Sequence, residues 1–596
     1  MVRRTSPVIL AGLALVAAQL AFRGWAISRS WFEFDDFAFI SILLNQPLHP
    51  STLLEGYGGH MMPGGLLLSW VYAKASPLDF TYQAVTLMVM QALASLGCLA
   101  LLRSLFGARW GILVPLSVYL FSAITLPAFL WWAAGINQLP MQIAFFWGLL
   151  LHVSYLRRPR ALTLAGTVAV MVLALCFYEK TLLVYGAIAI VTLAYFASGS
   201  LLERVVHVWR RYRPALLAHV VTGAVYLVLY SRFALDPNNA QVNDAPLLEL
   251  SQNLLLKSFV PGTVGGPLEW KQLTGPFQVV DPAQLTIVVA LLAVGALVVH
   301  TDRTRVRSRR AWFLPAWFLL ADLVLIASAR AAVLGGVVAL EMRYLTETAG
   351  AAAIALGLAT MPLRGAVETV EARRPSPLLD RREWAAVATV VMTALGLVSA
   401  YRFANGWGDA TASRDYFRTV ASQLAEHEGR VPAVSVSVPQ YLMWGYRYPE
   451  NTTSHVLRMY DDRFAYPSVT VDELYVVDDH GKIVPAVIAP KWANVPRWKG
   501  CGYRLDQGRS VPLNGPVTGG GGWWVRMAYV ASQDTDITIR AGDETHETTL
   551  PKGWHNMYFT AAGDLSRIHF SGVGPGVTVC TNDVTVGVPA PLEPSP

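Results

Sequence analysis

The chain has 596 residues, of which 54 % are hydrophobic and 15 % are charged, and its formal net charge is +7. The mean hydropathy of +0.40 excludes an ordinary soluble protein. The positive charge does not indicate a nucleic-acid partner. The arginines are confined to short connections between long apolar runs, where they set the orientation of a protein in a bilayer.

About eleven apolar runs of spanning length predict a polytopic α-helical membrane protein. The first run, 7–27, follows Arg3 and Arg4 and lacks a convincing cleavage site, so we interpret it as a retained anchor rather than a signal peptide. The other predicted spans are 80–102, 111–130, 139–156, 161–177, 181–198, 214–232, 284–300, 311–328, 346–363 and 384–401.

Arginine-rich connections alternate with arginine-poor ones along this series of spans. Because arginine and lysine collect on the cytoplasmic side, the rich connections predict a cytoplasmic N-terminus in the plasma membrane. An odd number of spans then places everything after residue 402 outside. The arginines concerned are Arg3, Arg4, Arg103, Arg109, Arg157, Arg158, Arg160, Arg204, Arg210, Arg211, Arg213, those from Arg303 to Arg310, and those from Arg364 to Arg382.

The predicted transmembrane domain, 1–402, has two long outer connections, 28–79 and 233–283. In the first of them, the apolar patches FAFISILL and GGLLLSWVYA are too short to span a bilayer. They predict helices that lie along the membrane surface. The second connection mixes apolar and polar pieces, and a plain surface linker is the less favoured alternative for it.

The composition changes after residue 402. An amphipathic stretch at 412–430 predicts a helix, and a hairpin turn is predicted at Asp479-His480-Gly481, so we expect an α/β subdomain over 403–495. Short alternating runs over 496–588 predict a β-sandwich. The tail, 589–596, is predicted to be disordered.

Four cysteines occur in the chain, two of them in the polar C-terminal part. Cys98 and Cys176 lie in apolar runs and are interpreted as packing residues. Cys501 and Cys580 could form a disulfide that joins the first and last strands of the sandwich, which requires an oxidising compartment.

Two adjacent carboxylates, Asp35 and Asp36, occupy the stretch WFEFDDFAFI just after the first span. An acidic pair at a membrane surface is costly unless it binds a ligand or takes a proton. Glycosyl transfer with inversion needs one carboxylate to accept the proton of the attacking hydroxyl, while a second can hold that base or a metal ion. The alternative is a solvated helix start, where carboxylates are favourable.

With this layout the sequence resembles the GT-C superfamily of integral membrane glycosyltransferases, which use polyprenyl-phosphate sugars. The pair Asp35-Asp36 matches the acidic pair of their first outer loop. The segment His60-Met61-Met62-Pro63 is similar to a His/Lys-x-Pro segment of the protein O-mannosyltransferases and the aminoarabinose transferase, and EMRYLTE at 341–347 looks like their late Arg-Tyr feature. The predicted sandwich resembles carbohydrate-binding modules of mycobacterial arabinofuranosyltransferases.

The resemblance implies an inverting enzyme with a polyprenyl-phosphate sugar donor and a cell-envelope acceptor (a glycan, a lipid or a protein). Asp35 or Asp36 would be the base, with Asp36 slightly preferred, and Arg343 with Lys180 would receive the donor phosphate because guanidinium and ammonium groups pair with phosphate oxygens. A divalent ion (Mg, Mn or Ca) would have Asp35, Asp36 and His60 as ligands. The supporting site residues are His60, Glu179, Glu341 and Tyr344.

Each of these residues has a structural alternative. Glu179 and Lys180 could pair with each other in a tight turn, Arg343 could be an interfacial anchor, and His60 could make a structural hydrogen bond. In the C-terminal part, the candidates for stacking on sugar rings are Trp523, Trp524 and Trp554, with core packing as the alternative.

Two other classes of function compete with the enzyme. A transporter or flippase of a lipid-linked precursor should have mid-membrane charges and related halves, neither of which the sequence displays. A non-catalytic envelope assembly protein with a sugar-binding domain is the second rival. The Arg-, Trp- and Ala-rich composition is typical of an actinobacterium.

Overall fold

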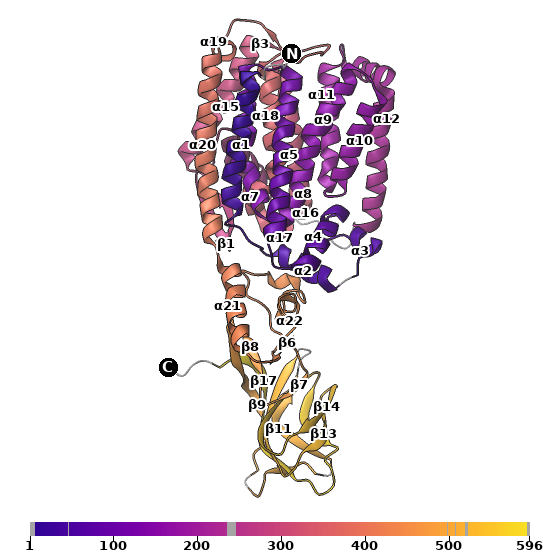
Figure 1. Cartoon of the computed structure of the whole chain (residues 1–596), viewed down its shortest axis with the longest axis vertical. Coiled ribbons are helices and arrows are strands. Elements are labelled where there is room, and N and C mark those ends of the chain that lie inside the picture. The colour runs from indigo at the N-terminus through magenta and orange to yellow at the C-terminus, as the bar shows by residue number, and fades with distance from the viewer. Residues whose placement is uncertain are drawn as a thin grey trace. The chain divides into compact units, whose positions relative to one another are not determined.

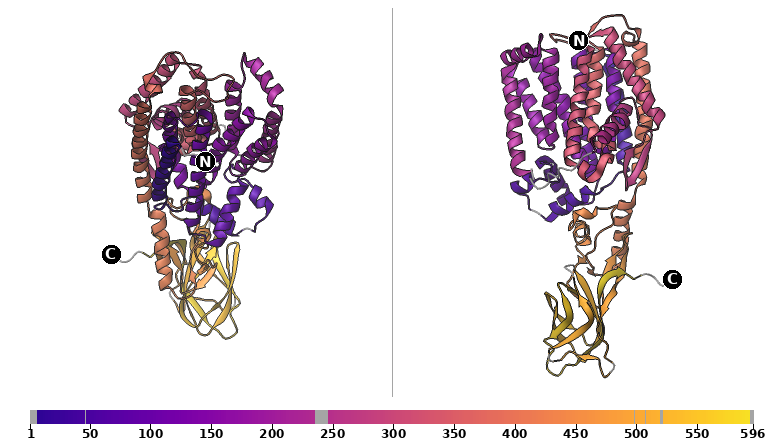
Figure 2. Two further views of the ribbon diagram at one scale, coloured as in Figure 1. Left: turned by 45° about the horizontal axis from the view of Figure 1, so that its top comes forward. Right: turned by 180° about the vertical axis from the view of Figure 1, so that it is seen from behind.

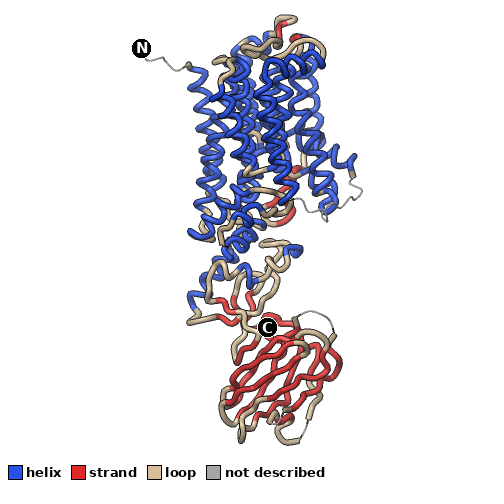
Figure 3. Tube along the Cα trace, turned by 90° about the vertical axis from the view of Figure 1, so that its right-hand side faces the viewer, coloured by secondary structure: helices blue, strands red, loops and turns tan. Residues whose placement is uncertain are grey.

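The computed structural model describes residues 6–45, 47–234, 246–497, 499–506, 508–518 and 522–592. The chain divides into two compact units, Met1–Thr411 and Ala412–Pro596. Helices make up most of the first unit, and strands are the main regular structure of the second (Figure 3). The boundary predicted at 402 falls inside helix α20, Arg382–Asp409, because that helix continues for two turns beyond its apolar part. Arg3 and Arg4 lie outside the described residues.

All eleven predicted spans are helical, and the first unit is a polytopic α-helical bundle. Within the described ranges, seven helices are long and apolar enough to cross a membrane, and a pair bent by 41° makes eight. Three predicted spans, α10, α11 and α18, have only 15, 14 and 15 residues. The helices are α1 Pro7–Ile27, α5 Thr81–Phe106, the bent pair α6 Leu113–Leu120 and α7 Leu126–Leu130, α8 Trp132–Ile143 with α9 Leu149–Arg157, α10 Ala161–Leu175, α11 Leu182–Tyr195, α12 Leu201–Phe233, α15 Gln284–Thr304, α16 Phe313–Ala329, α18 Thr346–Thr360 and α20.

Helix α18 lies in the middle of the bundle and is buried along most of its length. Its sequence, TETAGAAAIALGLAT, consists mainly of small residues, which let neighbouring helices approach closely. A Cβ atom added at Gly357 would lie 2.5 Å from the ring of Phe106, and one at Gly350 would lie 3.1 Å from Phe146. The small side chains are therefore required by the packing.

Different elements lie at the two ends of the bundle (Figures 1 and 2). The start of α1, strand β3 (Arg305–Val306) and helix α19 (Pro377–Asp380) lie at one end, while α2 (Asp35–Asn45), α3 (Pro50–Leu54) and α4 (Pro63–Ala75) lie at the other. The first end carries the arginine-rich connections after α15 and α18. Helices α2 and α4 contain the two apolar patches that were predicted to be short helices.

Ion pairs join the arginine-rich connections to one another. Glu368, in the connection after α18, accepts a hydrogen bond of 2.6 Å from Arg204 Nη2 and pairs with Arg310. Arg305 pairs with Asp380 in the same way. These ion pairs connect the α18–α20 connection to α12 and to the α15–α16 connection at one end of the bundle.

The second long connection, 233–283, has more structure than a linker. It contains α13 Leu247–Gln252, a π-helical segment Asn253–Phe259, α14 Val260–Thr263 and a hairpin of β1 Trp270–Thr274 and β2 Phe277–Val280. Its residues 235–245 lie outside the described residues. A second irregular stretch precedes α18 and consists of α17 Ala331–Leu334 and the 3-10 turns Gly335–Leu340 and Met342–Leu345.

The second unit begins with the predicted amphipathic helix, α21 Ala412–Glu426, and continues into two facing antiparallel sheets. Apolar residues of both sheets, including Val525, Ile539 and Phe570, form one buried core. The first sheet has the order β7-β15-β12-β17-β9-β8 with β10 beside β17, and the second has the order β11-β16-β13-β14. The strands are β7 Val469–Val471, β8 Tyr475–Val477, β9 Ile483–Ala493, β10 Tyr503–Arg504, β11 Arg509–Val517, β12 Trp523–Ala531, β13 Thr535–Ala541, β14 Glu544–Leu550, β15 Gly553–Ala561, β16 Leu565–Ser571 and β17 Val579–Pro591.

The predicted limits of the sandwich are too narrow. Strands β7, β8 and β9 precede residue 496 but pair into the first sheet, so 403–495 is not separate from it. The tail predicted to be disordered from 589 continues the last strand to Pro591, because this segment pairs with β9, and residues 593–596 lie outside the described residues. The hairpin predicted at Asp479-His480-Gly481 is confirmed by the pairing of β8 with β9.

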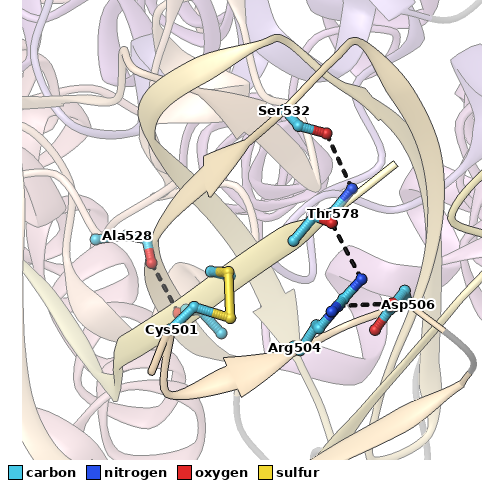
Figure 4. The surroundings of a disulfide bond; sticks show 8 residues. Cys501, Arg504, Asp506, Ala528, Ser532 and Thr578 are labelled. Carbon is cyan, nitrogen blue, oxygen red and sulfur yellow. Dashed lines mark hydrogen bonds and ion pairs between the residues drawn. A yellow bond between two sulfur atoms is a disulfide. The ribbon is translucent and has the colours of Figure 1, made fainter. Parts of the chain in front are cut away.

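The predicted disulfide between Cys501 and Cys580 is present (Figure 4). It joins the segment before β10 to the last strand, β17, over a sequence separation of 79 residues. Polar contacts surround it: Arg504 pairs with Asp506 at 2.7 Å and donates to the Thr578 hydroxyl at 3.2 Å. The Thr578 amide donates to the Ser532 hydroxyl at 3.0 Å.

Candidate functional site

The acidic pair lies at the end of the bundle opposite the arginine-rich connections. Helix α1 ends at Ile27, and Asp35 and Asp36 form the first turn of α2. The residue before them, Phe34, has a φ of +46°, a left-handed conformation that a side chain other than glycine rarely adopts. Such backbone strain occurs most often at functional sites.

The two carboxylates have different surroundings. Asp36 is fully buried, and both of its oxygens accept backbone hydrogen bonds, from Glu33 N–H at 3.0 Å and from Ala133 N–H at 2.8 Å. Burial raises the pKa of Asp36 well above its ordinary value, although these amide hydrogen bonds oppose the rise. Since Ala133 lies in the first turn of α8, Asp36 joins the start of α2 to the start of α8.

Asp35 is only half-buried. Its Oδ1 lies 3.5 Å from the hydroxyl of Tyr57, which comes from the same outer connection. Its charge also acts on Arg343, in the turn before α18. Asp35 is therefore close enough to act electrostatically on the predicted phosphate-binding arginine.

Arg343 is a buried cation with one unused donor. Its Nη2 pairs with Glu341 Oε2 at 2.7 Å and donates to the Tyr344 hydroxyl at 3.1 Å. Its Nε is buried and has no hydrogen-bond partner among the described residues. Burial acts to lower the pKa of Arg343, but the charges of Glu341 and Asp35 raise it above its ordinary value. The guanidinium therefore stays charged.

Aromatic rings surround the guanidinium. Its carbon lies 4.6 Å from the ring centre of Trp131 and 5.5 Å from that of Phe277. Phe277 begins β2 and also packs edge-on against Phe34, at 4.8 Å between ring centres. A small pocket lies beside Arg343, lined among others by Trp131, Phe277, Glu341 and Trp407.

Lys180 does not line this pocket, and two carboxylates bind its ammonium group. Its Nζ lies 2.6 Å from Asp322 Oδ1 and contacts Glu347 Oε1, and all three side chains are nearly inaccessible. The charge of Lys180 is thus already compensated, and its predicted role as a phosphate ligand stays a prediction. The predicted alternative, a pair between Glu179 and Lys180, is wrong, because Lys180 pairs with Asp322 and Glu347 while Glu179 binds His60.

His60 and Glu179 form a second polar cluster. A tight turn with Gly58 at φ +58° and Gly59 at φ +86° presents His60, whose Nδ1 lies 2.7 Å from Glu179 Oε1. His60 Nε2 lies 3.3 Å from Nη2 of Arg330. The glycines are required there because both turn residues have positive φ. The structural hydrogen bond predicted as the alternative for His60 is thus present.

The three predicted metal ligands do not come together as a site. Both oxygens of Asp36 accept backbone amides, and His60 is paired with Glu179. In the described part of the chain, no group of three or more His, Cys, Asp or Glu side chains is arranged to hold a metal ion. Asp35, Asp36 and His60 therefore do not fit a metal centre of three protein ligands.

The three candidate tryptophans of the second unit differ in accessibility. Trp524 is buried in a small core with Val434 and Leu474. Trp523 packs edge-on against Trp492. Trp554 is 80 % exposed, so it is the one of the three that offers its ring to solvent.

Comparison with known proteins gives structural likenesses of low similarity. No protein-family model matches the sequence, and no curated protein matches it. The crystal structure of ArnT from Cupriavidus metallidurans bound to undecaprenyl phosphate is similar at a TM-score of 0.42 and 14 % identity, over 78 % of this chain and 93 % of that one. The arabinofuranosyltransferase AftD from mycobacteria is similar at a TM-score of 0.40 and 9 % identity, over 97 % of this chain and 60 % of that one.

A third structure, the arabinosyltransferase EmbB from Mycobacterium smegmatis, has a TM-score of 0.25 and 13 % identity, over 99 % of this chain and 66 % of that one. Two of the protein groups that the sequence resembles are thus among the structures similar to this one. At these TM-scores the likenesses do not define an activity, which we argue from the residues of this chain.

The sequence did not single out several residues of the site. Phe34 and Phe277 carry no local signal of their role, because each acts through a packing contact with a distant segment. Asp322 does carry a local signal in the sequence. It is a lone carboxylate in the apolar run FLLADLVL, and burying a carboxylate in a bilayer costs free energy, so such a residue is a candidate functional position.

Proposed function

We propose that this protein is a membrane glycosyltransferase that inverts the configuration of the transferred sugar, with Asp35 as the base. The observation that carries the proposal is the combination of a half-buried carboxylate, Asp35, with a buried and incompletely paired guanidinium, Arg343, among aromatic rings. The acceptor needs a base, and a phosphate leaving group needs a fixed positive charge.

In the proposed reaction, the Asp35 carboxylate accepts the proton of the acceptor hydroxyl while that oxygen bonds to the anomeric carbon. The bond between the anomeric carbon and the phosphate oxygen breaks at the same time, and the lipid phosphate leaves. Arg343 compensates the charge on the phosphate, because a guanidinium can donate to two oxygens at once. Asp36 positions α2 against α8, which reverses the preference for Asp36 that the sequence alone suggested.

The proposed donor is a polyprenyl-phosphate sugar on the outer face of the plasma membrane. The arginine-rich connections and the acidic pair lie at opposite ends of the bundle (Figure 1), and arginine favours the cytoplasmic side. Cytosolic nucleotide sugars have no direct access to the outer side, so a lipid carrier is the donor class that fits. The acceptor would be an envelope glycan, lipid or protein.

Single substitution of the two aspartates tests the proposal. Membranes with Asp35→Asn should transfer sugar from a labelled polyprenyl-phosphate donor at least about 100-fold more slowly, the usual effect of removing a general base. Asp79→Asn is the matched control, because Asp79 lies in the same outer connection and accepts a hydrogen bond from the Thr81 amide at the start of α5. Transfer at the normal rate by Asp35→Asn would contradict the assignment.

The donor itself can be identified from lipids that copurify with the chain. Mass spectrometry should detect a sugar-bearing polyprenyl phosphate in preparations of the unmodified protein and much less of it with Arg343→Gln. Copurification of the lipid without any transfer activity would favour the transporter over the enzyme.

A further inference from the structure

Lys180, Asp322 and Glu347 form an ionic cluster inside the helical bundle. They come from the turn between α10 and α11, from α16 and from the first turn of α18. The exposed fractions of their side chains are 7 %, 0 % and 0 %. Buried ion pairs of this kind are often no more stabilising than apolar side chains of similar volume, because desolvation offsets the attraction. Stability alone is therefore a weak explanation for the cluster.

The cluster is connected to the main chain of the turn that carries Arg343. Lys180 Nζ donates a hydrogen bond of 2.9 Å to the carbonyl oxygen of Tyr344. The neighbouring carbonyl oxygen, that of Arg343 itself, accepts a hydrogen bond of 3.2 Å from Gln138 Nε2 on α8. Two successive carbonyl groups of one short turn are thus held by side chains from other elements.

The two holding side chains belong to the same network. Thr346 donates to Gln138 Oε1 at 2.5 Å, and its hydroxyl also lies 3.2 Å from Glu347 Oε2. Glu347 in turn contacts Lys180. Because hydrogen bonds in a low-dielectric interior polarise and strengthen one another, such a connected network fixes its members more firmly than isolated contacts would.

We infer that Lys180, Asp322 and Glu347 are positioning residues: they orient the Met342–Leu345 turn so that the guanidinium of Arg343 is placed for the phosphate of the lipid donor. Lys180 acts through the Tyr344 carbonyl, and the two carboxylates hold Lys180 in place. This inference rests on the proposed function, since it assigns the support of the same phosphate site. It replaces the direct contact between Lys180 and phosphate that the sequence predicted.

A double-mutant cycle separates positioning from direct contact. The probe is undecaprenyl phosphate, titrated into the full chain in nanodiscs. Lys180→Met should weaken its binding about tenfold, a typical coupling between neighbouring residues. In the Arg343→Gln background the same change should have less than about a twofold effect, because the guanidinium to be positioned is absent. If the fold-weakening of binding in the double variant equals the product of the two single effects, the inference is overturned.

A charge-free variant separates positioning from stability. Lys180→Met alone leaves two buried carboxylates uncompensated and should lower the melting temperature. The combination Lys180→Met, Asp322→Leu and Glu347→Leu should restore the melting temperature, since apolar replacements of buried ion clusters are tolerated. It should still bind undecaprenyl phosphate weakly, because no side chain then holds the Tyr344 carbonyl. If this variant recovers both the melting temperature and the binding of undecaprenyl phosphate, the inference is overturned.

His152→Leu is the matched control for the loss of a buried polar side chain. His152 bonds to Thr192 and His219 and has no hydrogen bond to the Arg343 turn among the described residues, so its replacement should leave the binding of undecaprenyl phosphate unchanged. If Arg343→Gln itself binds the probe normally, the proposed phosphate site is wrong. If only Lys180→Met binds it normally, the site stands and the positioning role is wrong.

Discussion

Asp36 links two helices through its carboxylate oxygens, each of which accepts one backbone N–H. One of these donors, Glu33, is local, and the other, Ala133, is 97 residues away. An aspartate that satisfies the amides at two helix starts resembles a capping residue more than a reactive one. Its neighbour Asp35 is half-buried and acts electrostatically on Arg343, and the proposed reaction assigns the role of base to it.

This difference predicts that Asp36 matters for stability. Asp36→Ala leaves two buried amides without an acceptor and should lower the free energy of unfolding by about 1–3 kcal/mol. Asp36→Asn retains one acceptor oxygen and should cost less. Thermal unfolding of the detergent-solubilised chain, followed by circular dichroism, measures both. An unchanged melting temperature for Asp36→Ala would show that the amides find other partners.

At the residue scale, the sequence could locate the site but could not divide its roles. The acidic pair is visible because carboxylates beside an apolar run are rare. Which carboxylate is saturated depends on Ala133, and no local pattern connects position 36 to position 133. The same holds for Lys180, whose partners Asp322 and Glu347 come from two other helices.

At the scale of elements, apolar run length predicted where the long helices of the bundle lie. It did not predict which helices are shortened. Helices α10 and α11 end on either side of Tyr178-Glu179-Lys180, where buried polar contacts replace a helical turn. Nor could run length predict the hairpin of β1 and β2, whose Phe277 packs against Phe34 and near Arg343.

The arginine-rich connections give an element-scale prediction with a defined pH dependence. Hydrogen bonds from Arg204 and Arg310 lower the pKa of Glu368 to about 2, from an ordinary 4.5. A carboxylate with a lowered pKa contributes stability above pH 4.5, and that contribution is lost as the pH falls toward 2. Glu368→Gln should therefore lower the melting temperature by about 2–4 °C at pH 7.

The effect of Glu368→Gln should shrink between pH 4.5 and pH 2, where the unmodified chain loses the same contribution. Differential scanning calorimetry across this range measures it. Glu383→Gln is the control, because Glu383 is exposed and its pair with Arg382 should contribute little. A difference between Glu368→Gln and the unmodified chain that does not change with pH would contradict the assignment.

At the scale of the whole molecule, the two kinds of unit were predictable because membrane helices and sandwich strands have different periods. The boundary between the two units was harder to predict. Strands β7, β8 and β9 looked like part of an α/β subdomain, since strand pairing with β15 and β17 is a long-range property. Only the cysteine pair gave a long-range restraint that could be read from the sequence.

The disulfide should make a large contribution to the stability of the second unit. Closing a loop across a separation of 79 residues constrains the unfolded chain, which corresponds to about 4 kcal/mol in the chain-entropy description. The double variant Cys501→Ser, Cys580→Ser should unfold its sheets at a lower temperature than the unmodified chain. Reductant should lower the melting temperature of the unmodified chain and leave the variant unaffected. Equal melting temperatures would contradict this account.

The same disulfide has a consequence for chemical labelling. Once Cys501 and Cys580 are joined, the remaining thiols are Cys98, which is buried, and Cys176, which is partly buried. The oxidised chain is therefore nearly inert toward water-soluble thiol reagents. A single cysteine introduced at Lys74, at one end of the bundle, or at Arg309, at the other, would stand out against this background and report the side of the membrane on which it lies.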